Sequence, residues 1–200
     1  LALLGAGCIG PLAEPADGRE ATRRPPSAPR SVLAVIVVAA VAGGAFESGF
    51  RAAGPLLAAD EGLLADALRL AALVGAGSFL MMLPFGALAD RIGAASVLLA
   101  CSMLVTLALA LLLALPAWLL PLAFVLGAGG GGLYTIAIAY GAQRADAAQF
   151  TRIVAAGGGA YTAGSLLSPL ATGWLLEVGS PLLATGVLAA VASTATGVLW

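Results

Sequence analysis

Two opposite charges lie four residues apart inside an apolar stretch, and they are the first candidates for chemistry in this sequence. Glu47 and Arg51 share one face of a predicted helix over 32–58, because a helix brings residues i and i+4 together. Such charges are expensive in lipid and face a partner or a wet cavity. If hydrocarbon begins near Val32, Glu47 lies roughly 22 Å deep, in the outer half, and Arg51 roughly 28 Å deep. Glu47 therefore either binds a proton or a solute, or forms a merely neutralising pair with an outward-reaching Arg51.

Two tyrosines stand next to runs of glycine and form the second set of candidates. Tyr134 follows the four glycines at 129–132, and Tyr161 follows the three at 157–159. Each phenol can offer a hydrogen bond to a solute, and each ring has bare backbone beside it as a pocket wall. The alternative is that the rings pack on that backbone and bond helix to helix.

Other chemistry is excluded by the residues that are missing. Histidine is absent and every cation is arginine, so imidazole catalysis, histidine metal sites and lysine Schiff bases do not apply. Cys8 and Cys101 lie in separate apolar stretches without metal-binding spacing. The net charge of −1 offers no basic surface for nucleic acid. We therefore expect no enzyme activity, no metal, no cofactor and no nucleic-acid partner.

The elements that position these residues are apolar helices. Hydrophobic residues make up 61% of the chain and charged residues 10%, which is far from the balance of a water-soluble domain. Crossing a hydrocarbon core takes about 20 helical residues. The sequence therefore predicts an all-α polytopic membrane helix bundle in a lipid bilayer. The six predicted transmembrane helices cover 32–58, 65–88, 95–115, 118–142, 152–176 and 181–200.

Two shorter parts precede this six-helix domain of residues 32–200. Residues 1–13 are apolar but too short to span, and we interpret them as the truncated end of a preceding transmembrane helix, with a signal peptide as the alternative. Residues 14–31 are charged and contain Pro25-Pro26, which is typical of a linker. Arginines near span ends are retained on the cytoplasmic side, and Arg30, Arg91 and Arg144 fall in alternate connections. The linker and both termini are therefore predicted to be cytoplasmic.

A motif lies between the second and third predicted spans. The octapeptide G-A-L-A-D-R-I-G contains Gly86, Asp90, Arg91 and Gly93. It resembles the G-x-L-a-D-r-x-G loop motif of major facilitator superfamily transporters, which is found between the second and third helices of each six-helix half. The next two residues are alanines where the family often has basic residues, so the pattern is degenerate here.

The resemblance, which covers the predicted six-helix domain, implies the C-terminal six-helix half of such a transporter, built as two three-helix repeats. It implies secondary active transport of a small solute by alternating access, with proton-coupled efflux as one form and a missing N-terminal six-helix half as partner. It also implies a cell membrane location, the bacterial inner membrane. In the family the first helix of each triplet lines the pathway, which favours Glu47. The alternative is a non-transporting membrane interaction or scaffold protein, or an inactive transporter fragment.

A short internal similarity supports two repeats. Gly86 and Asp90 in the second span compare with Gly173 and Glu177 in the fifth, each stretch following a proline. The two stretches end on opposite predicted faces, as inverted triplets require.

The arginine asymmetry makes a prediction about topology. Cysteines introduced by Asp90→Cys and Ala145→Cys should be protected from a membrane-impermeant thiol reagent in intact cells, because both positions are predicted to face the cytoplasm. A cysteine introduced by Gly62→Cys should react. Labelling of the first two positions would reverse the predicted orientation.

Overall fold

The computed structural model describes residues 30–60, 67–179, 185–188 and 190–191. Its long helices are α1 (Arg30–Asp60), α2 (Ala67–Ile92), α3 (Ala94–Ala114), α4 (Leu119–Ala142) and α5 (Ala147–Val178), with a short 3-10 helix, η2 (Pro116–Trp118). These helices lie where the first five spans were predicted, and the all-α class is confirmed. Most of the predicted sixth span, residues 1–13 and nearly all of the linker lie outside the described residues.

Four helical segments are long and apolar enough to cross a membrane by length and composition: Arg30–Pro55, Leu68–Ile92, Ala94–Ala114 and Pro116–Ala142. Helix α5 has 32 residues, which is also a sufficient length, but its many glycine and hydroxyl-bearing residues make it less apolar. The described part of the chain is therefore a membrane helix bundle.

Local chemistry accounts for the helix ends. Asp146 caps α5, because its Oδ1 accepts a hydrogen bond of 2.8 Å from the backbone N–H of Gln149. Gly93 alone separates α2 from α3, with a φ of 89° that favours glycine. Pro116 begins η2 and follows the end of α3, since proline cannot supply the N–H that would continue that helix.

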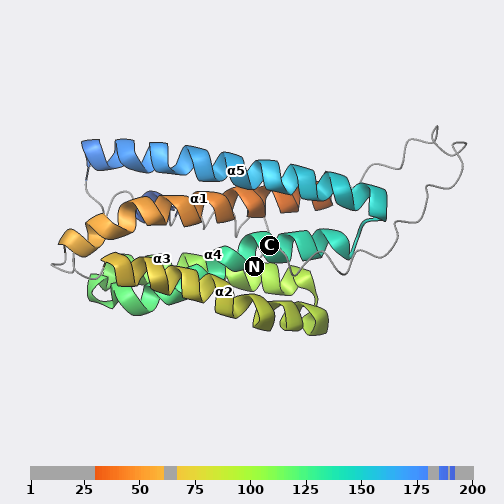
Figure 1. The fold of residues 1–200 in the computed structure, drawn as a ribbon, viewed down its shortest axis with the longest axis horizontal. Coiled ribbons are helices and arrows are strands. Elements are labelled where there is room, and N and C mark those ends of the chain that lie inside the picture. The colour runs from red at the N-terminus through yellow and green to blue at the C-terminus, as the bar shows by residue number, and fades with distance from the viewer. Residues whose placement is uncertain (1–29, 61–66, 180–184, 189, 192–200) are drawn as a thin grey trace, which may run out of the picture.

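Helix α4 lies at the centre of the bundle. It packs against α1, α2, α3 and α5, and 61% of its membrane-crossing segment is buried, against 17% for α2. Figure 1 shows α1 and α5 side by side on one side of the molecule and α2, α3 and α4 together on the other. Helices α1 and α5 run in the same direction, as do α2 and α4, whereas α1 and α4 run in opposite directions.

Backbone contact joins α1 to α5. A Cβ added to Gly44 of α1 would collide with the carbonyl oxygen of Tyr161, and one added to Gly164 of α5 would collide with that of Val41. Ser165, which follows Gly164, donates a hydrogen bond of 3.4 Å to the Gly44 carbonyl oxygen. We call this contact the α1–α5 seam. Glycine is required at both of its closest points, because any side chain would separate the helices.

The same contact recurs between α4 and α2. A Cβ on Gly127 of α4 would collide with the carbonyl oxygen of Val74, and one on Gly77 of α2 would collide with that of Phe124. Ser78, which follows Gly77, donates a hydrogen bond of 2.8 Å to the Gly127 carbonyl oxygen. This contact, the α2–α4 seam, repeats the α1–α5 seam group for group.

The two seams define an internal two-fold relation. Gly127 stands 83 positions after Gly44, and Gly164 stands 87 positions after Gly77. The same offsets relate Val41 to Phe124, Val74 to Tyr161, and Ser78 to Ser165. Helix α1 is therefore equivalent to α4, and α2 is equivalent to α5. Since α1 and α4 run in opposite directions, the described part of the chain has the geometry of two inverted repeats.

The short similarity seen in the sequence belongs to this relation in part. Gly86 and Gly173, and likewise Asp90 and Glu177, are 87 positions apart and occupy equivalent places on α2 and α5. The prolines do not correspond, because Pro169 is equivalent to Met82 rather than to Pro84.

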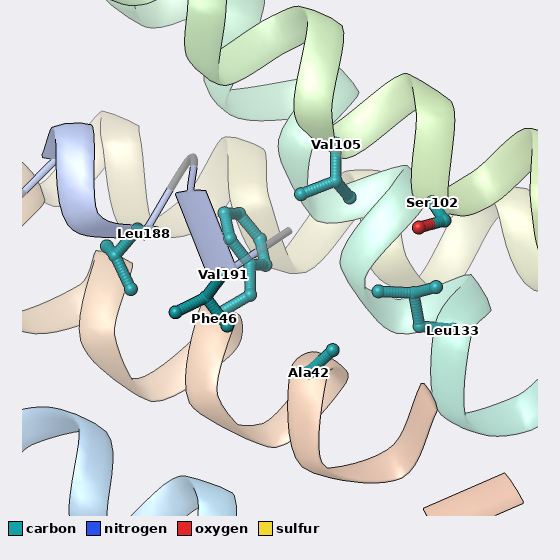
Figure 2. Close-up of a pocket in the computed structure, with 7 residues that line it drawn as sticks. All are labelled: Ala42, Phe46, Ser102, Val105, Leu133, Leu188 and Val191. Carbon is teal, nitrogen blue, oxygen red and sulfur yellow. The ribbon is translucent and has the colours of Figure 1, made fainter. Parts of the chain in front are cut away.

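A small apolar cavity lies in the core between α1, α3, α4 and residues 188 and 191 (Figure 2). Its volume is about 10 Å³, which is at most room for one water. Phe46 of α1 lines it and also stacks on Phe50, with ring centroids 5.7 Å apart. Because neighbouring residues on a helix point in different directions, Phe46 enters the core while Glu47 faces away from this cavity.

The crossing of α1 and α4 depends on Gly130. A Cβ there would lie 2.5 Å from the ring of Phe46, which is buried and held by Phe50. Gly130→Ala should therefore lower the thermal unfolding temperature in detergent, because overpacking costs ~1–3 kcal/mol and outweighs the gain in helix propensity of ~0.5–1 kcal/mol.

Gly75→Ala is the matched control for this prediction. Gly75 lies within α2 with no group within 4 Å of an added Cβ, so only the gain in propensity applies. Equal unfolding temperatures for the two variants would show that the Phe46 contact does not constrain the crossing.

Candidate functional site

Glu47 and Arg51 form the ion pair that their spacing predicts. Arg51 Nη2 lies 2.6 Å from Glu47 Oε1 on the same face of α1. The Glu47 side chain is 21% exposed and the Arg51 side chain 60% exposed, so the carboxylate sits inside and the guanidinium reaches outward. In the structure Arg51 reaches outward from the ion pair. Glu47 has a further partner.

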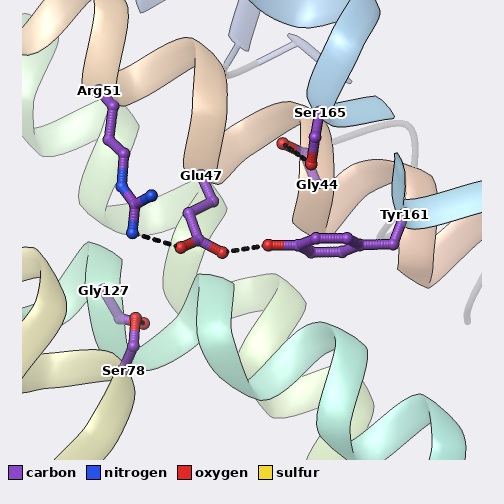
Figure 3. Close-up of polar contacts among 7 residues, drawn as sticks. All are labelled: Gly44, Glu47, Arg51, Ser78, Gly127, Tyr161 and Ser165. Atoms are coloured by element: carbon purple, nitrogen blue, oxygen red, sulfur yellow. Dashed lines mark hydrogen bonds and ion pairs between the residues drawn. The ribbon is translucent and has the colours of Figure 1, made fainter. Parts of the chain in front are cut away.

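Tyr161 of α5 supplies that partner. Its hydroxyl donates a hydrogen bond of 2.5 Å to Glu47 Oε2 across the α1–α5 seam. Figure 3 shows the carboxylate between Arg51 on one side and Tyr161 on the other, with one oxygen directed to each. Both oxygens of Glu47 are therefore occupied, one by a charge on its own helix and one by a phenol from another helix.

Tyr134 joins the same group from α4. Its ring lies 4.9 Å from that of Tyr161, centroid to centroid, at a tilt of 44°. Within the described residues its hydroxyl makes no hydrogen bond, so it contributes by ring contact. The structure therefore brings together all four residues proposed for the pathway, and we call Glu47, Arg51, Tyr134 and Tyr161 the Glu47 cluster.

Glu47 lies close to the internal two-fold axis. The equivalent of Phe46 is Gly129, and the ring of Phe46 packs on the next residue, Gly130. In a two-fold arrangement a position meets its own equivalent only near the axis. Glu47 follows Phe46 and therefore lies near the axis, midway along the bundle.

Hydroxyl groups near the cluster are used within the protein. Thr135 Oγ1 donates to the Gly131 carbonyl at 3.0 Å, and Thr162 Oγ1 donates to the Gly158 carbonyl at 2.9 Å, each within its own helix. Ser78 and Ser165 bond across the two seams. Sequence reasoning did not single out Ser78, although its place directly after a glycine matches that of Ser165.

The motif residues lie at the end of α2 and not in the Glu47 cluster. Gly86, Asp90 and Arg91 belong to the helix, which continues to Ile92, and Gly93 alone forms the turn. The second span was predicted to end at residue 88, but α2 continues through Asp90 and Arg91 to Ile92, and Gly93 with its positive φ is enough to reverse the chain. Asp90 and Arg91 are exposed.

The described residues contain no group of three or more histidine, cysteine, aspartate or glutamate side chains that could hold a metal ion. Cys101 is buried in the core and contacts the bare surface of Gly132, where a Cβ would lie 2.6 Å from its sulfur. The Glu47 cluster therefore offers the chemistry of one half-buried carboxylate, one guanidinium and two phenols.

Comparison with solved structures identifies the class of fold. The chain matches the in meso crystal structure of the POT family transporter PepTSo with a TM-score of 0.76 and 20% sequence identity. The match covers 88% of this chain and 37% of that transporter, so the chain spans well under half of its length. No protein-family model and no curated protein matches the sequence. Over the matched residues the chain therefore has the helical fold of that membrane transporter.

The bond between Tyr161 and Glu47 should contribute to stability. Tyr161→Phe keeps the ring contact with Tyr134 but removes the donor, and a hydrogen bond to a charged group is worth ~1.5–3 kcal/mol, less where water reaches it. We expect a loss of ~1 kcal/mol in unfolding free energy, measured by denaturant titration in detergent.

Tyr134→Phe is the control, because its hydroxyl bonds no described residue while its ring makes the same contact. It should leave the unfolding free energy nearly unchanged. A loss as large as that of Tyr161→Phe would show that ring packing, and not the Glu47 bond, is responsible.

Proposed function

We propose that this chain is one half, the C-terminal half, of a secondary active transporter that moves a small solute across a cell membrane, with both termini in the cytoplasm. The carrying observation is the place of Glu47. It is the one carboxylate among the described residues that lies away from a helix end, and it joins α1 to α5. A charge so placed in a membrane helix marks a pathway for a solute or a proton.

Glu47 carries the coupling proton in this proposal. Ionised, it balances Arg51 and accepts the hydrogen bond from Tyr161. Protonated, it no longer attracts the guanidinium, so Arg51 is released and the link between α1 and α5 weakens. Alternating access requires an element with two arrangements whose balance a bound ligand shifts. Proton binding at Glu47 supplies that shift, and coupled efflux is the form of transport we favour.

The position of the cluster fits a solute site. Transporters built of inverted repeats bind their solute near the bilayer midplane at the repeat interface. The Glu47 cluster lies near the internal two-fold axis, with Arg51 exposed beside it and the rings of Tyr134 and Tyr161 as a wall. These groups can bind a small solute that carries a polar or charged end.

Exposed apolar faces on α2 and α5 support a partner half. Phe79 and Leu83 on α2 and the equivalent Leu166 and Leu170 on α5 are all more than half exposed. The missing N-terminal six-helix half is the proposed partner for part of this surface, with the lipid bilayer covering the rest. The coverage of 37% of the matched transporter fits a half of this kind.

Substitution of Glu47 tests the coupling. Glu47→Gln keeps the shape and hydrogen-bonding capacity but cannot take up a proton. In proteoliposomes that contain the transporter with both halves, this variant should lose solute accumulation driven by a pH gradient, while downhill exchange of the solute continues.

Glu177→Gln is the matched control, because Glu177 is exposed at the end of α5 and outside the cluster. It should retain accumulation. If Glu47→Gln accumulates solute as well as the parent does, Glu47 is structural. If the parent moves no solute, the scaffold or inactive-fragment alternative holds.

A further inference from the structure

The Glu47–Tyr161 bond spans the α1–α5 seam one helical turn from its closest point. Glu47 follows Gly44 by three residues on α1, and Ser165 follows Tyr161 by four residues on α5. The backbone carbonyl that approaches Gly44 most closely belongs to Tyr161 itself. The distance between the two helices at Gly44 therefore determines whether the phenol of Tyr161 can reach the carboxylate.

From this geometry we infer that Gly44, Gly164 and Ser165 are positioning residues for the Glu47 site, whereas their equivalents in the α2–α4 seam only hold helices together. The inference rests on the proposed function in taking Glu47 as the working carboxylate. In this inference the α1–α5 seam keeps Tyr161 close enough to hydrogen-bond Glu47, so that any change in the separation of α1 and α5 changes that bond.

The internal two-fold supplies the contrast between the seams. The α2–α4 seam has the same two glycines and the same serine, but its position equivalent to Glu47 is Gly130 and that equivalent to Tyr161 is Val74. It therefore carries the packing of the α1–α5 seam without the polar bond. Figure 3 shows both serine contacts together, Ser165 with Gly44 beside the cluster and Ser78 with Gly127 away from it.

The size of the effect follows from hydrogen-bond geometry. The Tyr161 oxygen lies 2.5 Å from Glu47 Oε2, and O–H···O hydrogen bonds have oxygen–oxygen distances of about 2.5–3.0 Å. A methyl group on Gly44 would lie 2.9 Å from Ser165 Oγ and closer still to the Tyr161 carbonyl oxygen, so the helices must move apart. A displacement on the order of 1 Å is enough to break the bond.

Few other groups can act on Glu47. Those that face it are Arg51 on its own helix, Tyr161 on α5 and, through the Tyr161 ring, Tyr134 on α4. Helix α2 has no charged residue between Arg69 and Asp90. A change at Glu47 caused by the seam must therefore act through Tyr161 or Arg51.

The test measures the reactivity of Glu47 with dicyclohexylcarbodiimide, an apolar reagent that enters membranes. The carboxyl oxygen bonds to the central carbon of the reagent while the carboxyl proton passes to one of its nitrogens, and mass spectrometry quantifies the modified peptide. An oxygen held by Tyr161 is protected. Gly44→Ala should accelerate modification of Glu47 about fivefold, which is the factor that corresponds to the ~1 kcal/mol expected for loss of the Tyr161 bond.

Gly127→Ala, in the equivalent place of the other seam, is the control. It should lower the unfolding temperature by a similar amount and leave the rate of Glu47 modification unchanged. The gentler pair Ser165→Ala and Ser78→Ala removes the serine hydroxyl from each seam without adding volume, so it decides the question if the alanine at Gly44 prevents folding. Ser165 also hydrogen-bonds the side chain of Tyr161, for which Ser78 has no equivalent. Ser165→Ala alone should then accelerate modification.

A double-mutant cycle separates positioning from loosening. In a Tyr161→Phe background Gly44→Ala should give no further acceleration, because the bond on which it acts is already lost. Equal acceleration by the variants of both seams, or by Gly44→Ala in both backgrounds, overturns the inference. None of these readouts measures transport. The inference can therefore be overturned while Glu47→Gln still abolishes solute accumulation, and it can hold while Glu47→Gln accumulates solute as the parent does.

Discussion

Contact between helix backbones, with no side chain between them, is the interaction on which this structure depends. Lipid offers no hydrophobic force to press one apolar helix on another, so association relies on close packing and on hydrogen bonds between helices. Glycine provides the close packing at two equivalent seams, and a serine directly after one glycine in each adds a hydrogen bond to the facing carbonyl. The remaining contacts are arranged around these two seams.

The central position of α4 follows from the same property. Its glycine-rich middle accepts α1 on one face, where Phe46 lies against Gly130, and accepts α2 on another. A helix with larger side chains at these places could not approach both partners. Helices α2 and α5 differ from α4, because each buries only one stripe of its surface in the bundle. Large apolar side chains on their outer faces therefore remain exposed.

The polar cluster departs from the internal two-fold relation, and this asymmetry is informative about function. The packing glycines and serines are kept in both repeats, whereas Glu47 and Tyr161 have Gly130 and Val74 as their equivalents. Packing needs the same groups wherever two helices touch, but a pathway needs its charge at one place. The residues that obey the two-fold relation therefore explain the fold, and those that break it mark the candidate site.

Sequence by itself determined the features that depend on neighbouring residues. Long apolar stretches specified five of the helices, because the length of a membrane helix is visible in the chain itself. A spacing of four residues specified the Glu47–Arg51 pair, because one helical turn brings such residues together. The short similarity between the second and fifth spans was also visible, although its prolines suggested an alignment two residues from the one that packing adopts.

Only the tertiary structure decided how distant helices meet. The Tyr161–Glu47 bond joins residues 114 positions apart, and no local pattern specifies which phenol reaches which acid. The position of Glu47 along the bundle also required the fold, because the crossing of α1 and α4 places it midway along the bundle. Hydropathy describes one segment at a time, whereas the Glu47 cluster is shared by α1, α4 and α5. Its geometry depends on the distances between these helices, which are determined by glycines at the helix contacts.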